Sequence, residues 1–359
     1  MTDPGALITA FAIAFAVTFV ATPVAIRIAR RISFYDVPAG YKQHAAPTPY
    51  LGGVALILGL AAGTLAVSAG TGEIRAALGI AAVLLVVGTL DDRVGLGIGV
   101  RIAAQVAAGF GLYQAGISWP MLDAGAANLL LTILFVVGTI NAYNLMDNLD
   151  GATGTVALVS AGALGIYAAV DGDAVLAPLA LALAGACASF LPYNLARPGA
   201  RVFLGDGGSM PIGLLIAAVI LTAPGATHLG WGLVPVAVVM VGLPAFDTTL
   251  VIVSRLKQGD LIMSGGRDHL THRLLEHMGS PRRVARALAI GQAEASALAI
   301  LCLELSPAGA AVVSTLALLA GAALVAVVVS RQGEPAPERT ESVPELARHA
   351  RAVREKSPA

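Results

Sequence analysis

Long apolar runs are the feature of this sequence that most restricts its fold. Eleven stretches of about 16 or more residues have largely uncharged centres. Roughly 20 apolar residues in a helix cross the ~30 Å hydrocarbon core of a bilayer, so each stretch predicts a transmembrane helix. Their approximate limits are 6–28, 51–69, 74–90, 100–116, 127–146, 154–170, 174–192, 209–223, 231–253, 285–304 and 308–330.

The composition agrees with a membrane protein, because 57% of the residues are hydrophobic and only 12% are charged. The 22 Lys and Arg residues balance 22 Asp and Glu residues, which argues against a nucleic-acid partner. Cys187 and Cys302 both lie in apolar runs, which excludes a disulfide scaffold and a cysteine zinc cluster. We therefore predict an all-α, polytopic membrane bundle for residues 1–330. Residues 331–359 are predicted to form a cytoplasmic tail, either disordered or folded as a short surface helix.

The placement of positive charge predicts the orientation of the bundle. If the loops alternate between the two sides, 21 of the 22 Lys and Arg residues follow odd-numbered helices, and Arg75 lies on the other side. The positive-inside rule then places the N-terminus outside the plasma membrane and the C-terminus in the cytoplasm. A miscounted helix would scramble this asymmetry, so the asymmetry supports the count of eleven.

Four polar clusters fall on the predicted cytoplasmic side, each at the end of a different apolar run or in the loop after it. Separate segments can therefore converge on one face of a helical bundle. The clusters are Asp91-Asp92-Arg93, residues 141–151 (Asn-Ala-Tyr-Asn-Leu-Met-Asp-Asn-Leu-Asp-Gly), residues 201–209 (Arg-Val-Phe-Leu-Gly-Asp-Gly-Gly-Ser) and residues 265–273 (Gly-Gly-Arg-Asp-His-Leu-Thr-His-Arg).

The cluster at 141–151 is predicted to place polar groups on one face of a helix. Asn141, Asn144 and Asn148 follow the i, i+3, i+7 spacing of a helix, and Gly151 is expected to end or bend that helix. A single intramembrane Asn usually bonds to a neighbouring helix. Five polar side chains in ten residues instead favour a ligand site.

The other three clusters each have a structural and a functional interpretation. Asp91-Asp92 is either a polar helix end or a metal or acid–base pair, because adjacent carboxylates raise each other's pKa unless a cation neutralises them. Residues 205–209 form either an ordinary glycine-rich turn or a phosphate-binding turn before a helix N-terminus. His269 and His272 suit phosphate or zinc, and the lack of a third ligand nearby makes zinc the weaker choice.

Together, the carboxylates, histidines and arginines suit a hard divalent cation and a diphosphate substrate. Mg²⁺ takes one or two carboxylates together with phosphate oxygens, and Arg and His offset the remaining negative charge. These residue types predict phosphoryl transfer at the cytoplasmic face. A transporter is the rival interpretation, but transport predicts charged residues near the bilayer midplane, whereas the acids here lie at one side.

These motifs, in this order, resemble those of the polyprenyl-phosphate N-acetylhexosamine-1-phosphate transferases. The resemblance extends from about Lys42, through residues 47–53 (Pro-Thr-Pro-Tyr-Leu-Gly-Gly), to about Gly279. It implies transfer of a sugar 1-phosphate, with N-acetylglucosamine as the first choice, from a UDP-sugar to undecaprenyl or decaprenyl phosphate, with release of UMP. It also implies Mg²⁺ or Mn²⁺ as cofactor, a product used for cell-envelope glycans, and a bundle compatible with a homodimer.

A sister family is the closest alternative within this resemblance. The phospho-N-acetylmuramoyl-pentapeptide translocases have ten helices and consecutive histidines in the last cytoplasmic loop. Eleven predicted spans and the sequence His269-Leu-Thr-His272 favour the first family.

The resemblance also implies roles for individual residues. Asp206 is the expected Mg²⁺ ligand, Asp91 is expected to deprotonate or orient the lipid phosphate, and Asp92 is expected to support the metal or the diphosphate. Asn144, Asp147 and Asp150 are expected to line the nucleotide-sugar cleft, and Phe203 is expected to pack on uracil. The catalytic His269 is expected to hold the diphosphate or sugar, together with Arg267 and His272. Lys42 and His44 are expected to meet the lipid phosphate.

Two positions depart from the pattern of that family, and a third matches it. Thr271 replaces a histidine that is common in the last loop, so a role for this position is in doubt. Asn148 stands where glycine is usual, so the fit near the uracil is expected to differ. Asp247, which follows Pro244, matches the family's Pro-x-x-Asp, and helix capping or pairing is as plausible for it as catalysis.

Overall fold

The computed structural model describes residues 3–36, 47–68, 71–119, 124–173, 176–261 and 266–330. Within them the chain is almost wholly helical, apart from a short antiparallel pair, β1 (Tyr35–Asp36) and β2 (Thr48–Pro49). The helices are α1 (Pro4–Arg31), α2 (Gly52–Val67), α3 (Gly72–Val94), α4 (Ile98–Gln114), α5 (Gly125–Met146), α6 (Ala152–Asp171), α7 (Leu176–Asn194), α8 (Asp206–Leu221), η1 (Ala226–Gly232), α9 (Leu233–Val241), α10 (Leu243–Gln258), α11 (Leu270–Met278), α12 (Pro281–Leu303) and α13 (Pro307–Ser330).

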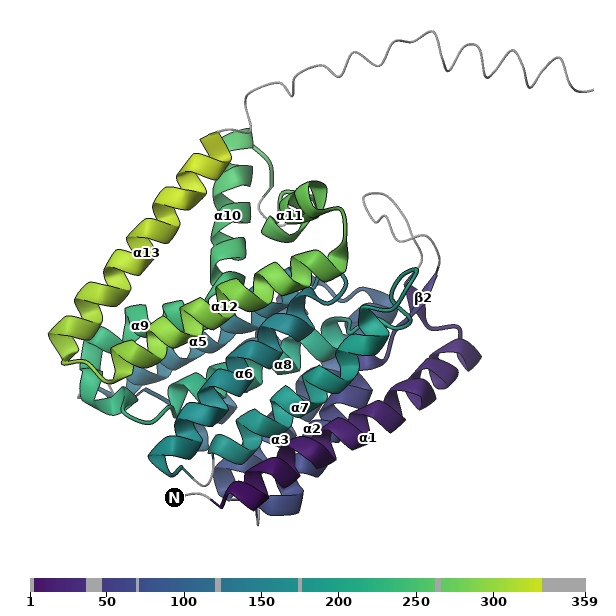
Figure 1. Ribbon diagram of the computed structural model, residues 1–359, viewed down its shortest axis with the longest axis horizontal. Coiled ribbons are helices and arrows are strands. Elements are labelled where there is room, and N and C mark those ends of the chain that lie inside the picture. The colour runs from purple at the N-terminus through teal and green to yellow at the C-terminus, as the bar shows by residue number, and fades with distance from the viewer. Residues whose placement is uncertain are drawn as a thin grey trace, which may run out of the picture.

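Each apolar run is helical over most of its described residues, which confirms the all-α membrane fold (Figure 1). Seven helices of the described chain are long and apolar enough to cross a membrane, or eight if a bent pair counts as one span. α2 and α8 are shorter apolar helices of 16 residues each. The count of eleven spans and the orientation of the bundle stay predictions.

The run at 231–253 is broken, so the prediction of one continuous helix there was wrong. α10 is bent by 86° relative to the preceding helical segment that ends with α9. Gly242, between them, has φ 65° and ψ −123°, a backbone that a residue with a side chain rarely adopts. Pro244 then lies in the first turn of α10, where it needs no N–H partner. As a result α10 turns away from the direction of α12 and α5 (Figure 1).

α5 also ends earlier than the spacing of its asparagines predicted. Its last residue is Met146, and Gly151, with φ 79°, precedes α6. Asn148 therefore lies in the turn between the two helices. The prediction that it shares a helix face with Asn141 and Asn144 was wrong. Its Nδ2 donates to the carbonyl of Leu145 at 2.6 Å, which satisfies one of the free carbonyls at the end of α5.

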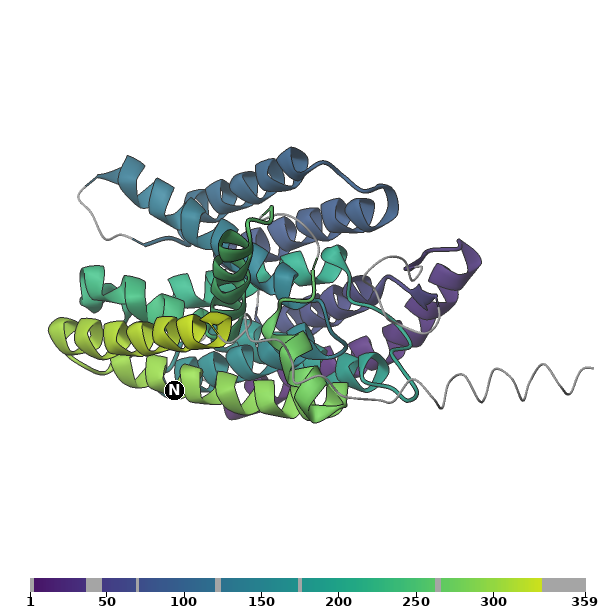
Figure 2. The same cartoon turned by 90° about the horizontal axis from the view of Figure 1, so that it is seen from above.

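α8 is the central helix of the bundle. Its residues Gly207–Leu221 are all buried, and it packs against α2, α3, α5 and α6. A helix that is apolar on every side belongs inside a protein, which explains why this short helix is surrounded by longer ones. Figure 2 shows the layers from above, with α4 in blue at one side and α12 and α13 in green and yellow at the other.

Two glycines let neighbouring helices approach the first turn of α8. A Cβ at Gly88 of α3 would collide with the backbone of Asp206, and a Cβ at Gly53 of α2 would come within 2.5 Å of the Cα of Gly208. Small residues at such crossings allow the close helix contacts that membrane bundles need. The ends of α2 and α3 are thereby held at the start of α8, where the polar clusters meet.

Candidate active site

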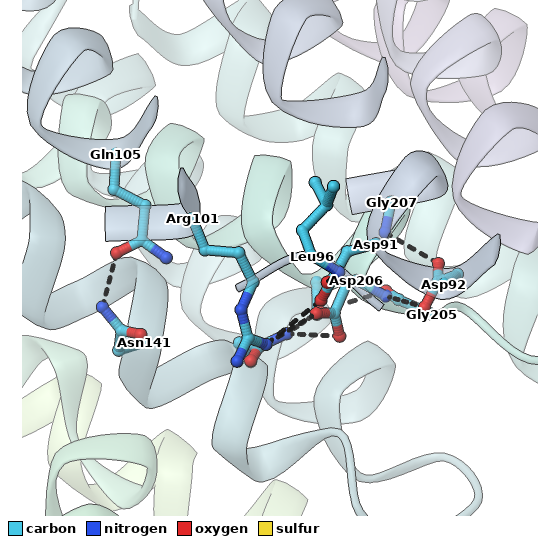
Figure 3. A network of polar contacts seen from close by, with 11 residues as sticks. Asp91, Asp92, Leu96, Arg101, Gln105, Asn141, Gly205, Asp206 and Gly207 are labelled. Atoms are coloured by element: carbon cyan, nitrogen blue, oxygen red, sulfur yellow. Dashed lines mark hydrogen bonds and ion pairs between the residues drawn. The ribbon is translucent and has the colours of Figure 1, made fainter. Parts of the chain in front are cut away.

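Carboxylates from α3 and α8 meet at a guanidinium from α4 (Figure 3). Nη1 of Arg101 lies 3.1 Å from Oδ2 of Asp91 and 3.3 Å from Oδ2 of Asp206. Oδ1 of Asp91 also accepts the N–H of Leu96 at 2.5 Å. The structure thus brings together the clusters at 91–93 and 201–209. Sequence reasoning missed Arg101, although a cation ten residues after the Asp pair, near the start of an apolar run, was an available signal.

Asp92 caps the N-terminus of α8. Its Oδ1 accepts the N–H of Asp206 at 3.0 Å, and its Oδ2 accepts the N–H of Gly207 at 3.2 Å (Figure 3). The free N–H groups at a helix start attract anions, and here the anion is the Asp92 carboxylate, so phosphate binding at this turn stays a prediction. Gly205 has φ 70°, and a Cβ at this position would collide with the Asp92 carboxylate. The proposed metal role of Asp92 stays a prediction.

Asn144 orients the carboxylate of Asp206. Its Nδ2 donates to Oδ1 of Asp206 at 2.8 Å and lies 2.9 Å from Oγ of Ser209, a contact that sequence reasoning did not include. Asn141 instead donates to Oε1 of Gln105 at 2.6 Å, so it joins α5 to α4. The site interpretation therefore fits Asn144, and the helix-to-helix interpretation fits Asn141.

The two acids after α5 face different surroundings. Burial, followed by repulsion from Asp206 and Asp92, raises the pKa of Asp147 to about 8, so at neutral pH this residue is mostly protonated. Oδ2 of Asp150 accepts the N–H of Ala200 at 3.3 Å. Asp147 thus lies within electrostatic reach of the carboxylate cluster, whereas this contact of Asp150 is to the loop before α8.

Phe203 lies beside the chain segment that leads into α2. Its N–H donates to the carbonyl of Pro49 at 2.8 Å, and its carbonyl accepts the N–H of Gly52 at 3.1 Å. Its ring packs edge-on to Tyr50, with 6.3 Å between the ring centroids. The ring of Phe203, three residues before Asp206 in the sequence, therefore lies next to Tyr50. The predicted contacts of Lys42 and His44 lie outside the described residues.

α10 holds the segment that carries the histidines. Oδ2 of Asp247, which is fully buried, lies 2.8 Å from Nδ1 of His269, and its Oδ1 accepts the N–H of Leu270 at 2.6 Å. Asp247 therefore both caps α11 and pairs with His269, the two structural roles left open for it. Further along α10, Arg255 makes a two-pronged ion pair with Asp268, at 2.8 and 3.0 Å.

A hydrogen bond joins this segment to the turn after α5. Oγ1 of Thr271 donates to Oδ1 of Asn148, so the two departures from the family pattern are partners. Close by, the ring centroids of His269 and His272 are 6.1 Å apart. Burial, followed by the charges of His269 and Arg267, lowers the pKa of His272, whose buried Nδ1 has no hydrogen-bond partner in the described part of the chain.

The donor atoms of this site suit magnesium better than zinc. Among residues that the structure describes, no three His, Cys, Asp or Glu side chains form a group able to hold a metal. Mg²⁺ needs only one or two carboxylates, since water and phosphate oxygens complete its octahedron. Asp91 and Asp206 already share one cationic nitrogen, that of Arg101. The residues therefore fit a magnesium ion held by Asp206, with Asp91 or Asp92, and the substrate.

Comparison with known proteins gives consistent matches. Residues 74–223, which contain the first three polar clusters, match glycosyl transferase family 4. The decaprenyl-phosphate N-acetylglucosaminephosphotransferase of Mycobacterium leprae is 34% identical over 281 residues, covering 67% of this chain and 70% of that protein. Its namesake in Mycolicibacterium smegmatis is 35% identical, covering 67% and 68%. The undecaprenyl-phosphate alpha-N-acetylglucosaminyl 1-phosphate transferase of Escherichia coli is 31% identical, covering 72% and 73%.

Proposed function

The chain belongs to glycosyl transferase family 4, and on that basis we propose that it transfers N-acetylglucosamine 1-phosphate from UDP-N-acetylglucosamine to a polyprenyl phosphate. The lipid phosphate attacks the β-phosphorus of the donor, the bond to the α-phosphate breaks, and UMP leaves. The products are UMP and a polyprenyl-diphosphate sugar. The observation that carries this proposal is the meeting of Asp91, Asp206 and Arg101 inside a membrane bundle.

The reaction joins two anions, so the site must neutralise negative charge. The acceptor is a phosphate monoester and the donor is a diphosphate, which repel each other strongly in a medium of low dielectric constant. Arg101 places a positive charge between Asp91 and Asp206. Mg²⁺ held by Asp206 would stabilise the charge that develops on the transferred phosphoryl group.

The fixed geometry of the carboxylates supports separate roles for them. Asp91 is held through both oxygens, by Leu96 and Arg101, which suits a group that orients the lipid phosphate or accepts its proton. Asn144 holds Asp206 in one orientation, as a metal ligand requires. Asp92 keeps the first turn of α8 in place.

The second half of the site supplies contacts to the diphosphate or sugar. With Nδ1 of His269 directed at Asp247, its Nε2 is left to bond a substrate oxygen. His272 and Arg267, from the same segment, are proposed to share this task. Phe203 is proposed to pack on the uracil, because aromatic rings stack well on bases.

The location of the site follows from charge placement. Since 21 of the 22 Lys and Arg residues fall on one predicted side, we place the site at the cytoplasmic face of the plasma membrane. This side has soluble UDP-sugars, while the bilayer supplies the polyprenyl phosphate.

The proposal is tested by measuring nucleotide release from purified protein with undecaprenyl phosphate and Mg²⁺. UDP-N-acetylglucosamine, UDP-N-acetylgalactosamine and UDP-N-acetylmuramoyl-pentapeptide are supplied in parallel. We expect lipid-dependent UMP with UDP-N-acetylglucosamine. UMP with only the pentapeptide donor would assign the chain to the sister reaction, and uptake of UDP-sugar into vesicles without UMP release would support a transporter.

A further inference from the structure

We propose that Asn148 and Thr271 form a positioning pair that sets the distance between the two histidines and the Asp206 carboxylate. The proposal deepens the proposed transferase function and rests on it. Asn148 and Thr271 are 123 positions apart in the chain, yet Oγ1 of Thr271 donates to Oδ1 of Asn148.

Both partners are held in place by their surroundings. Nδ2 of Asn148 donates to the carbonyl of Leu145 at 2.6 Å, so the amide has one orientation and presents Oδ1 to Thr271. Thr271 is fully buried, in the first turn of α11. Because the Thr271 hydroxyl is buried, loss of its acceptor would leave it without a hydrogen bond and would cost free energy. The contact with Asn148 is therefore favoured over other arrangements of this segment.

On one side, the pair leads directly to the carboxylate cluster. Asn148 follows Asn144 by four residues, and Nδ2 of Asn144 donates to Oδ1 of Asp206 at 2.8 Å. The last turn of α5 and the residues after it therefore carry both contacts. A shift of Asn148 would move Thr271 relative to Asp206.

On the other side, Thr271 of the pair lies between the two histidines in the sequence. Thr271 follows His269 by two residues and precedes His272, so its contact with Asn148 anchors the backbone that carries both histidines. Asp247 and Arg255 hold the same segment from α10, which leaves the bundle at the bend after Gly242. The Asn148–Thr271 bond ties the segment to α5 as well, so that the position of the histidines does not depend on α10 alone.

The contact also makes the sizes of the two side chains depend on each other. A larger imidazole at the fully buried position 271 needs the space that the Asn148 side chain fills. A glycine at 148 would free that space. Each single exchange is therefore expected to be harmful, and the paired exchange is expected to be tolerated.

The test compares Asn148→Gly, Thr271→His and the double variant with wild type, in the intact protein. The kcat of UMP release and the KM values for UDP-N-acetylglucosamine and undecaprenyl phosphate are measured. We expect each single variant to lower kcat roughly tenfold with the lipid KM unchanged, and the double variant to recover to within roughly threefold of wild type. Thr249→Val, at an exposed threonine of α10, is the matched control and should behave as wild type.

Two outcomes would overturn the positioning pair. The first is a double variant whose fold loss in kcat equals the product of the fold losses of the two single variants. The second is that both single variants keep the wild-type kcat. Thermal midpoints of the same four proteins test the contact without activity, since interacting residues give non-additive shifts and additive shifts would refute it. Wild type with no UMP release would instead refute the proposed function, and the midpoints would still decide whether the pair exists.

Discussion

Asp247 and His269 form a buried pair, with 2.8 Å between Oδ2 of the carboxylate and Nδ1 of the ring. Asp247 has no exposed surface, and its second oxygen accepts the N–H of Leu270 at 2.6 Å. One side chain of α10 therefore fixes both the ring of His269 and the start of α11. The bend at Gly242 directs α10 towards the histidine segment, and this direction allows Asp247 to contact His269.

We expect Asp247→Asn to lower kcat roughly 10- to 100-fold, the usual cost of losing a partner that orients a functional ring. The amide has nearly the same shape, so the thermal midpoint should change little. UMP release and thermal unfolding of purified protein measure both. Asp260→Asn, at an exposed acid just after α10, is the control, and equal kcat in the two variants would contradict the role of Asp247.

Asp206→Asn is expected to abolish turnover while the protein stays folded. An amide is a poor ligand for Mg²⁺, but its oxygen still accepts the hydrogen bond from Asn144. Turnover at several Mg²⁺ concentrations, together with the thermal midpoint, checks this prediction. Wild-type activity at ordinary Mg²⁺ would refute Asp206 as the ligand.

Gly205→Ala should destabilise the protein by roughly 1–3 kcal/mol, because it forces a side chain into a positive-φ backbone. The added Cβ also meets the Asp92 carboxylate and would disturb the cap of α8. Gly97→Ala is the matched control, since Gly97 has φ −63° and a Cβ there meets nothing within 4 Å. Thermal unfolding of both variants tests this prediction. Equal midpoints would contradict the close contact between Gly205 and Asp92.

Asp147→Asn is expected to stabilise the protein only at higher pH. Because the pKa of Asp147 is raised to about 8, the native state keeps this proton to higher pH than the unfolded chain does. Wild type therefore loses stability as pH rises from about 4 to about 8, whereas the amide cannot ionise. The thermal midpoints should agree near pH 4 and separate near pH 9, and a difference independent of pH would contradict the raised pKa.

The sequence was sufficient to predict the class of fold and the segments that meet at the candidate site. Helix length and charge placement are local properties of the sequence. The apolar runs, and the helix ends near Asp91 and Asp206, could therefore be located without a structure. The break at Gly242 was missed because its cause includes tertiary contacts, among them the N–H of Leu243, which donates to Oε1 of Gln292 at 3.0 Å. Arg101 was missed because its two partners come from different helices.

The most direct test of the central claim follows the β-phosphate of the donor. Purified protein is given UDP-N-acetylglucosamine labelled with ³²P in the β-phosphate, together with undecaprenyl phosphate and Mg²⁺. If the protein transfers a sugar 1-phosphate, the label moves into the lipid fraction and the released UMP carries none. Label that stays in water-soluble UDP while sugar enters the lipid would show transfer of the sugar alone and would contradict the proposed reaction.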